Sequence, residues 1–463
     1  MLISAVRKSE LNAEFRIDSE YYSPENLRKE DAVLNHNHEF LGNLCGLIAG
    51  PFGSTVTAER YDENSGKRYI RGKDIQTPFV VDADPVFIEG GLFDELPQFH
   101  LKENDILLTV VGMNFGKAAI VSSEDIPSIF SCKSTLIRNA KINVWYLLTY
   151  LSCDVGHGLV RRGQRGAAQP GINLFDIKTV PVPIFSEDFQ SKVEYLVKTA
   201  KDILRKSAAS FVESQDILLS EIGLDHWQPK HQLFFVKSYS DTEQSERVDA
   251  EYFQPKYEEI EQAIKEYSGG YSTIGEEFKQ NKSTFKIDDK KVYQYVEIGS
   301  VNVSNGEIIP NEVLGEELPA NAKRALKKGD VIVSKVRTYR GAITIVEESG
   351  YVGSGAFTVL HENDRINKET LLAFLHSKPL LAWSLKPNTG TSYPVIVDND
   401  ILNLPIPLIP ESKQTKIQEK VTESFSFRKQ YKHLLDCAKR AVEIAIDKDE
   451  KSANAWLKDQ AEV

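Results

Sequence analysis

The sequence predicts an α+β fold: two mostly-β domains, copies of one unit, separated by two long antiparallel helices and related by an approximate two-fold axis. The first observation is a repeat, since Arg16-Ile17-Asp18-Ser19-Glu20-Tyr21-Tyr22 recurs as Arg247-Val248-Asp249-Ala250-Glu251-Tyr252-Phe253. The second is that further matches follow in the same order, ending with Pro181-Val182-Pro183 and Pro405-Ile406-Pro407. The third is a long stretch without Pro or Gly after each of these Pro-x-Pro segments. A duplication explains all three observations.

The composition suits a globular protein of two domains. The chain has 463 residues, of which 41% are hydrophobic and 27% charged, which is enough for two cores. The formal net charge of −11 excludes a protein coated with positive charge, so a nucleic-acid ligand would need locally gathered basic residues. The sequence predicts neither a secretory signal nor a membrane span. We therefore expect a cytoplasmic location and no membrane contact.

The chain divides into seven segments by its turn signals and apolar patterns. Short β-prone runs separated by Gly, Pro and Asp predict the two β-rich domains, the first of which has one or two helices near 144–152. The segments are a leading segment (1–30), a first domain (31–185), a central helix (186–223), a linker with the second motif copy (224–269), a second domain (270–409), a distal helix (410–447) and a polar tail (448–463). The tail is expected to fray apart from Trp456-Leu457. The paired aromatics of the repeated motif are expected to be core residues.

Both predicted helices carry an apolar seam at alternating steps of four and three. Each is roughly 50 Å long at 1.5 Å per residue. Neither can bury its seam alone, so we expect an antiparallel coiled coil. The alternative is that each helix only covers its own β domain. The expected seam residues are Val193, Val197, Leu204, Phe211, Leu218, Ile417, Val421, Tyr431, Leu435 and Val442.

The sequence shows no catalytic constellation. The run from Gly112 to Ala118 resembles a phosphate loop, but it is one residue short and has Ala where Ser or Thr should bind magnesium. Cys45, Cys132, Cys153 and Cys437 form no pair at metal-ligand spacing and are interpreted as buried or incidental thiols. The nine histidines are scattered. We expect no catalytic residue, no metal and no cofactor in this chain.

Basic loops recur at corresponding places in the two copies. Arg and Lys bind phosphates and can fork onto guanine, while Asn and Gln can pair with adenine, so loops of this composition suit DNA binding. A solvated surface is the alternative for each run taken singly. The candidate DNA contacts are Lys117, Arg161, Arg162, Gln164 and Arg165 in the first copy, and Lys335, Arg337, Thr338, Tyr339, Arg340, Asn388, Thr389, Thr391 and Tyr393 in the second.

The ordered motifs resemble those of the DNA-specificity subunit of type I restriction-modification systems. Besides the repeated motif and the Pro-x-Pro segments, the resemblance includes Gly50-Pro51-Phe52-Gly53-Ser54, which adds Phe52 and Ser54 to the candidate DNA contacts. The second copy lacks this loop and has Gln280-Asn281-Lys282 nearby, so first-copy contacts do not transfer there. The resemblance implies two target recognition domains held apart by two helices, each reading one half of a split DNA sequence.

The resemblance also implies partners that carry the chemistry. Two methylation subunits would dock on the helices, and two motor-nuclease subunits can join them. S-adenosylmethionine, ATP and magnesium would then belong to the partners. We therefore expect a non-catalytic DNA-reading subunit that directs methylation and cleavage, with the helices setting the spacer between half-sites. The alternatives are a coiled-coil adaptor that binds only protein, and a nucleic-acid enzyme with an unrecognised site.

Overall fold

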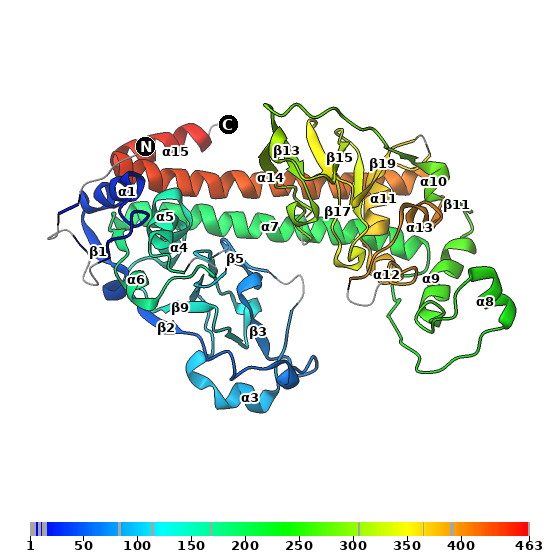
Figure 1. Ribbon diagram of the computed structural model, residues 1–463, viewed down its shortest axis with the longest axis horizontal. Coiled ribbons are helices and arrows are strands. Elements are labelled where there is room, and N and C mark those ends of the chain that lie inside the picture. The colour runs from blue at the N-terminus through cyan, green and yellow to red at the C-terminus, as the bar shows by residue number, and fades with distance from the viewer. Residues whose placement is uncertain are drawn as a thin grey trace. The chain divides into compact units, whose positions relative to one another are not determined.

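Figure 1 shows the computed structural model of the chain. It describes residues 6–7, 11, 16–81, 85–112, 115–166, 169–303, 306–363, 365–388 and 393–461. The chain divides into two compact units: the first comprises Met1–Asp202 and Gln430–Val463, and the second comprises Ile203–Lys429.

The first unit is built on a six-stranded sheet. Its central strand β6 (Ile106–Thr109) pairs antiparallel with β9 (Ser134–Arg138) and β7 (Ala118–Ile120), and all four β6 residues are buried. A strand covered on both faces needs a nearly continuous apolar run, which Ile106-Leu107-Leu108 supplies. The strands lie in the order β2 (Gly46–Ala49), β9, β6, β7, β5 (Phe79–Val80) and β4 (Ile75–Gln76).

Two strand pairs and several helices complete this unit. β3 (Arg68–Ile70) runs parallel to β8 (Ser128–Phe130), and β1 (His38–Phe40) runs antiparallel to β10 (Pro181–Pro183). The helices are α1 (Pro24–Leu34), α2 (Leu41–Leu44), α3 (Gly90–Glu95), α4 (Val144–Ser152), α5 (Asp154–Arg162) and α6 (Leu174–Lys178), with 3-10 turns at Ala58–Arg60, Gly72–Asp74, Pro97–Phe99 and Ser123–Asp125. α4 covers the residues for which the sequence predicts a helix.

The second unit has two four-stranded sheets and one strand pair. One sheet has the order β12 (Lys279–Gln280), β19 (Phe357–His361), β16 (Val331–Ser334) and β17 (Ile343–Ile345). The other has the order β14 (Asn311–Leu314), β13 (Val292–Val296), β18 (Tyr351–Ser354) and β15 (Ala322–Ala325), and β11 (Tyr271–Thr273) pairs with β20 (Pro405–Pro407). The helices are α8 (Tyr239–Ser245), α9 (Pro255–Lys265), α10 (Ile274–Glu277), α11 (Lys368–Leu375), α12 (Lys378–Trp383) and α13 (Asp398–Leu402), with 3-10 turns at Ile298–Ser300, Gly315–Glu317 and Thr338–Arg340.

The strand order confirms the duplication predicted from the sequence. β12-β19-β16-β17 repeats β2-β9-β6-β7, the parallel pair β13–β18 repeats β3–β8, and the antiparallel pair β11–β20 repeats β1–β10. The copies differ at their margins: the first adds β4, β5 and α3, and the second adds β14 and β15. The shared part therefore carries the turns and loops that the sequence singles out.

The two long helices are α7 (Glu187–Glu221) and α14 (Glu411–Asp447), and each supplies a segment to both units. In the second unit they run antiparallel, because Ser207 meets Ser424, Glu213 meets Lys420 and Glu221 meets Lys413. Ser207 and Ser424 each donate to the other's carbonyl, at 2.9 and 2.8 Å. A buried polar pair of this kind fixes the register of two helices.

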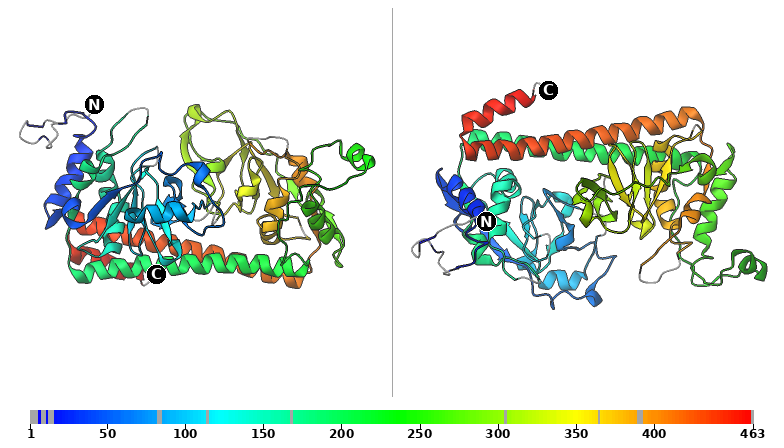
Figure 2. Two further views of the ribbon diagram at one scale, coloured as in Figure 1. Left: turned by 90° about the horizontal axis from the view of Figure 1, so that it is seen from below. Right: turned by 45° about the horizontal axis from the view of Figure 1, so that its top comes forward.

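The same two helices lie side by side in the first unit (Figure 2). There Val197 of α7 lies near Leu435 and Ala438 of α14, beside Pro78 of the β domain. Tyr431 lies with its ring centroid 6.3 Å from that of Phe79. In this unit as well, the seam residues contact both helix and domain.

The seam residues serve two purposes in the second unit. Leu218, Ile417 and Val421 are fully buried and belong to the same core cluster as Val331 and Ile343 of the sheet. The predicted helix pair is therefore present, but its seam also covers the adjoining β domain. The two alternatives weighed from the sequence are both partly correct.

The expectation of a frayed tail is wrong. Residues Glu450–Ala461 form α15, and Ala453 is fully buried. Asp449 accepts a hydrogen bond from the Ser452 amide at 2.7 Å, which caps the helix start. Glu450 accepts a hydrogen bond from the Ser186 amide at 2.9 Å and another from the Ser186 hydroxyl, which ties α15 to the start of α7.

Three of the four cysteines are buried, as expected, but Cys132 is exposed. Burial raises the pKa of the Cys45 and Cys153 thiols to about 12, so neither is a reactive thiolate. Within the described part of the chain, every helix is too short or too polar to cross a membrane.

Candidate nucleic-acid interface

One turn has the same backbone framework in both units. In the first, it leaves β6 after Thr109 and returns to β7, and the Gly112 amide donates to the Pro170 carbonyl at 3.0 Å. In the second, it leaves β16 after Ser334 and returns to β17, and the Arg337 amide donates to the Pro394 carbonyl at 2.7 Å. We call these the recognition turns, comprising 110–117 and 335–342, of which Met113 and Asn114 lie outside the described residues.

An arginine from α5 lies against the recognition turn of the first unit. The Arg161 guanidinium is 4.5 Å from the Phe115 ring centroid and donates from Nη1 to the Phe115 carbonyl at 3.3 Å. Gly116 has φ +89°, and a Cβ there would lie 3.1 Å from Arg161 Cγ. A side chain at Gly116 would therefore be strained and would crowd the arginine.

Lys117 and His157 also lie in this region. Lys117 donates from Nζ to Gln76 Oε1 at 2.6 Å, and burial lowers the pKa of its ammonium group. Burial first, and then the nearby Arg161 guanidinium, lower the pKa of His157. The positive charges of Lys117 and Arg161 beside this turn suit binding of an anionic polymer.

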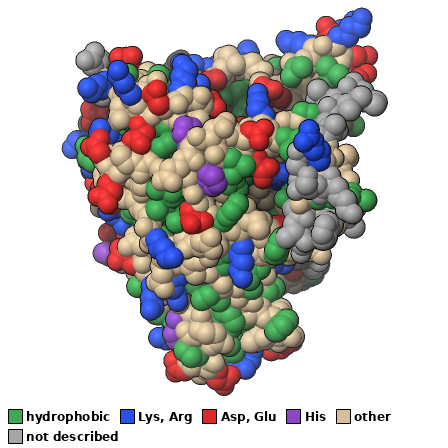
Figure 3. Space-filling view, turned by 90° about the vertical axis from the view of Figure 1, so that its left-hand side faces the viewer, with side chains coloured by type: hydrophobic (Ala, Val, Ile, Leu, Met, Phe, Trp, Pro, Cys, Tyr) green, Lys and Arg blue, Asp and Glu red, His purple; other side chains and the backbone are tan. Residues whose placement is uncertain are grey.

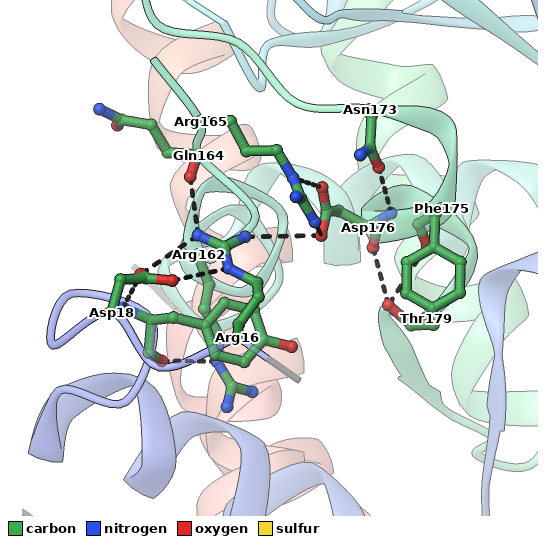
Figure 4. Close-up of polar contacts among 10 residues, drawn as sticks. Arg16, Asp18, Arg162, Gln164, Arg165, Asn173, Phe175, Asp176 and Thr179 are labelled. Carbon is green, nitrogen blue, oxygen red and sulfur yellow. Dashed lines mark hydrogen bonds and ion pairs between the residues drawn. The ribbon is translucent and has the colours of Figure 1, made fainter. Parts of the chain in front are cut away.

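Arg16 of the repeated motif holds the loop that follows α5 (Figure 4). It donates from Nη2 to the Gln164 carbonyl at 2.9 Å, and it forks onto Asp18 at 2.8 and 3.1 Å. Asp18 also accepts from the Tyr21 amide at 3.0 Å. The Arg16 guanidinium lies 4.5 Å from the Tyr21 ring centroid. We call this arrangement the loop clamp.

The second unit has the same loop clamp. Arg247 forks onto Asp249 at 2.6 and 2.8 Å and donates to the carbonyls of Pro387 and Asn388, at 3.4 and 3.1 Å. Its guanidinium lies 4.9 Å from the Tyr252 ring centroid. The hydrogen bond from Arg247 lowers the pKa of the Asp249 carboxyl. The clamped carbonyls stand at matching positions of the repeat.

The clamps correct part of the expectation that the paired aromatics of the repeated motif are core residues. Its second aromatic is buried in each unit, as Tyr22 and Phe253. Its first aromatic, Tyr21 or Tyr252, instead lies against an arginine. Repetition of the charged residues Arg and Asp was the signal for this role, because a core segment has no need to retain them.

Two candidate DNA contacts are buried and stabilise the fold instead. Arg162 pairs with Glu30 at 2.6 Å and lies 4.0 Å from the Tyr21 ring centroid. Thr338 donates to the Ser334 carbonyl at 2.5 Å. Both residues are less than a tenth exposed, so the prediction that they contact DNA directly is wrong. Their sequence neighbours Arg161 and Tyr339 are half-exposed. Position in the sequence alone does not tell which residue of such a run is buried and which is exposed.

Two further candidates are held by carboxylates. Arg165 pairs with Asp176 at 2.8 Å, and Lys335 pairs with Asp398 at 3.1 Å. These ion pairs neutralise part of the charge that the sequence offers to DNA. Both side chains shape the loops from which the exposed candidates project.

The remaining described candidates are exposed or half-exposed. These are Phe52, Ser54, Lys117, Arg161, Gln164, Arg337, Tyr339, Arg340, Asn388 and Tyr393. Thr389 and Thr391 lie outside the described residues. The Phe52 ring is 87% exposed, and its loop contacts the 131–134 turn, where the Gly50 amide donates to the Ser134 carbonyl at 3.1 Å.

Lys133 is a basic residue that the sequence reasoning missed. It is exposed, and its carbonyl accepts from the Val110 amide at 2.8 Å, so it lies between the Phe52 loop and the recognition turn. The second unit has no matching loop: Asn281 occupies the place of Gly50, and its amide donates to the Val359 carbonyl at 2.8 Å. A lone lysine carries no pattern that sequence alone could reveal.

His, Cys, Asp and Glu side chains are spread over the described residues. Among them, no group of three or more His, Cys, Asp and Glu side chains could hold a metal ion. The face in Figure 3 mixes basic and acidic side chains without an extended patch of one sign. The basic side chains that suit DNA binding lie instead in the loops described above.

Residues 271–427, in the second unit, match the family model of the type I restriction modification DNA specificity domain. A stretch of 112 residues is 24% identical to the type I restriction enzyme EcoDI specificity subunit of Escherichia coli; the match spans 24% of this chain and 24% of that protein. The chain thus aligns with about a quarter of that relative's length.

Two solved structures are also similar. The type I restriction-modification S subunit from M. genitalium is 14% identical, with a TM-score of 0.38; the match covers 89% of this chain and 96% of that chain. The HsdS subunit from Thermoanaerobacter tengcongensis is 15% identical, with a TM-score of 0.29; the match covers 89% of this chain and 97% of that chain. The family resemblance predicted from the sequence is confirmed for the second unit by the match to the family model.

Proposed function

We propose that this chain, whose residues 271–427 belong to the type I restriction-modification DNA specificity family, is a non-catalytic subunit that reads a bipartite DNA target, one half with each unit. The observation that carries the proposal is the recognition turn. It has the same backbone hydrogen bond in both units but a different arginine beside it: Arg161 from α5 lies against the first turn, and Arg337 belongs to the second. One scaffold with two sets of side chains suits two different half-sites.

The exposed side chains supply the chemistry of DNA binding. Arg161 and Arg340 can bind phosphates or fork onto guanine, whereas Asn388 already accepts a hydrogen bond from the Val395 amide at 2.9 Å through its Oδ1. Phe52 offers an exposed apolar ring of the kind that some DNA-binding proteins insert between base steps. The loop clamps hold Gln164 and Asn388 by their backbone, so these positions are fixed before DNA arrives.

The proposal assigns catalysis to partner subunits. Two methylation subunits would bring S-adenosylmethionine, and motor-nuclease subunits would bring ATP and magnesium. The net charge of −11 predicts weak DNA binding by the lone chain at low salt, because the basic loops act against long-range repulsion. Titrating the free chain and its methylation complex against one target measures this difference, and equal affinity of the two would contradict it.

The main test compares Arg340→Ala with Arg60→Ala in the complex. Arg340 is exposed, and its nearest ring contact is Tyr339 at 5.9 Å, whereas Arg60 pairs with Glu89 away from the recognition turns. Loss of a DNA contact costs about 1–3 kcal/mol, or roughly 5- to 150-fold in affinity. We expect this for Arg340→Ala and less than about twofold for Arg60→Ala. Equal effects would refute the assignment of the recognition turn.

Two further outcomes separate the alternatives. Partner binding without DNA retention in a gel shift would favour a protein-only adaptor. Methyl transfer or cutting by the chain alone, with S-adenosylmethionine, ATP and magnesium supplied, would favour an enzyme. Neither result is expected.

We also propose that α7 and α14 set the spacer between the half-sites. Four residues inserted after Ala208 in α7 add about 6 Å to that helix at 1.5 Å per residue. A matched insertion in α14 lengthens the second helix by the same amount. We expect a longer preferred spacer with both half-sites unchanged. A folded, DNA-binding variant that keeps its original spacer would contradict this part of the proposal.

A further inference from the structure

Gly112 and Arg337 occupy the same position of the recognition turn in the two units. Both have left-handed backbone, with φ +107° at Gly112 and φ +51° at Arg337. Both donate their amide to a matching proline carbonyl, Pro170 and Pro394. Glycine adopts this conformation without steric cost, whereas a residue with a long side chain does not. The second unit therefore bears backbone strain that the first avoids.

The surroundings of Arg337 keep its backbone in this conformation. The Arg340 amide donates to the Arg337 carbonyl at 2.9 Å. On the other side, the Ser334 hydroxyl donates to the Val336 carbonyl at 2.8 Å. With both flanks hydrogen-bonded, the direction in which the Arg337 side chain leaves the turn is set. Strain that the surrounding structure maintains points to a function of the side chain itself.

The Arg337 guanidinium is oriented but has no acidic partner. It lies 4.4 Å from the ring centroid of Tyr393, which is 63% exposed. Within the described residues Arg337 makes no ion pair, and its Nε has no hydrogen-bond partner. Lys335, two residues earlier, is by contrast paired with Asp398. Although Nε is buried, no acidic side chain among the described residues neutralises the Arg337 charge, and its guanidinium lies against an aromatic ring.

We propose that Arg337 is a specificity-determining residue of the second unit, which reads a guanine by forking onto its O6 and N7 in the major groove, with Tyr393 as its support. This inference rests on the proposed DNA-reading function. A phosphate contact would require only a positive charge, which a flexible lysine on unstrained backbone provides. A planar fork held in one orientation is what the paired acceptors of guanine require.

The inference also accounts for the difference between the two units. In the first unit this position of the turn is Gly112, which has no side chain, and Arg161 from α5 lies against the turn. The first unit therefore delivers its arginine from a helix, and the second delivers it from the turn. The same position is used for specificity in one unit only.

The test uses the complex with its methylation subunits and a DNA library randomised in both half-sites. The variants are Arg337→Lys, which keeps the charge but loses the fork, and Arg337→Gly, which restores the residue found at the matching position. We expect both to lose a preference for guanine of roughly 5- to 150-fold at one position of one half-site. All positions of the other half-site should stay unchanged.

Stability and support are checked with two further measurements. Arg337→Gly should unfold at the same or a higher temperature than the unmodified chain, because it relieves the left-handed strain without losing an ion pair. Tyr393→Leu removes the aromatic support and should weaken the same guanine preference by a smaller factor. An unchanged preference in all three variants would overturn the inference.

Two other outcomes have separate meanings. A uniform loss of affinity for every sequence would identify Arg337 as a phosphate contact and would also overturn the inference. An unmodified complex that selects no sequence at all would instead refute the proposed function. The library distinguishes these results because it reports each base position separately.

Discussion

Replacing Arg16 by alanine should loosen the loop that follows α5 while leaving the rest of the first unit folded. The Arg16 side chain is 9% exposed and donates to the Gln164 carbonyl. A hydrogen bond from a charged group contributes about 1.5–3 kcal/mol. The fork onto Asp18 adds only about 0–1 kcal/mol, because that carboxylate is 44% exposed. The expected loss is therefore about 1.5–4 kcal/mol of local stability.

The buried carboxylate nearby adds little to this loss. Asp176 lies 3.5 Å from Arg16 Nη1, but it keeps its shorter contacts with Arg165 at 2.8 and 3.0 Å. Removing Arg16 therefore does not leave a buried charge unpaired, which would cost considerably more.

Hydrogen exchange measures the effect at the amides of Arg165 and Gly171. These two residues exchange hydrogen bonds of 2.7 and 3.0 Å, so both amides are protected while the loop is closed. A loss of about 1.5–4 kcal/mol corresponds to roughly 13- to 900-fold faster exchange at these sites. The matched variant in the second unit is Arg247→Ala, which should affect only that unit. The control is Arg60→Ala.

The control separates a clamp from an ordinary ion pair. Arg60 pairs with Glu89 at 2.6 Å, but both side chains are more than a third exposed, so its loss should cost about 0–1 kcal/mol. If Arg16→Ala speeds exchange no more than Arg60→Ala, the clamp has no special role. Exchange that rises throughout the first unit would indicate a general folding defect instead.

Three further results are expected. Gly50→Ala should cost about 1–3 kcal/mol, because its Cβ would lie 2.2 Å from the Ser131 carbonyl oxygen; thermal unfolding measures this, and Gly91→Ala in open space is the control. Burial lowers the pKa of His376, so the second unit should lose stability as pH falls below 6.5. A His376→Gln variant whose unfolding free energy keeps the same dependence on pH would contradict this. The hydrogen bond from Arg247 lowers the pKa of Asp249 below 3.8 in the folded protein. The contribution of the Asp249 carboxylate to stability is therefore present above pH 3.8 and lost as pH falls through its folded pKa. Asp249→Asn should flatten the dependence of the unfolding free energy on pH in that range, which denaturant unfolding at several pH values measures.

The sequence predicted the parts of the fold that follow local patterns. The bounds of α7 emerged because Pro183 and Gly223 flank a run free of both residue types. The duplication was visible because both copies keep the same order of motifs. The helix α15 was missed because its polar composition gave a weak apolar stripe, although Asp449 offered a capping signal.

The site was predicted less completely because its contacts are distant in sequence. Arg16 and Gln164 are far apart in the chain, and no local spacing relates them. Arg161 and Arg162 are adjacent and chemically identical, yet one lies beside the recognition turn and the other is buried against Tyr21. The direction in which each points depends on the packing of α5, which a charge pattern does not reveal. The domain boundaries stay predictions.

In each loop clamp an arginine donates hydrogen bonds to backbone carbonyl oxygens, which every amino acid has. A substitution at Gln164 can therefore change the side chain that its loop displays without releasing the arginine that holds it. Asn388 differs, because its side chain also accepts a hydrogen bond from the Val395 amide at 2.9 Å. A lineage can thus change the side chain at position 164 by point mutation while inheriting the same backbone path. The same property favours directed evolution, since libraries randomised at this position should contain a high proportion of folded proteins.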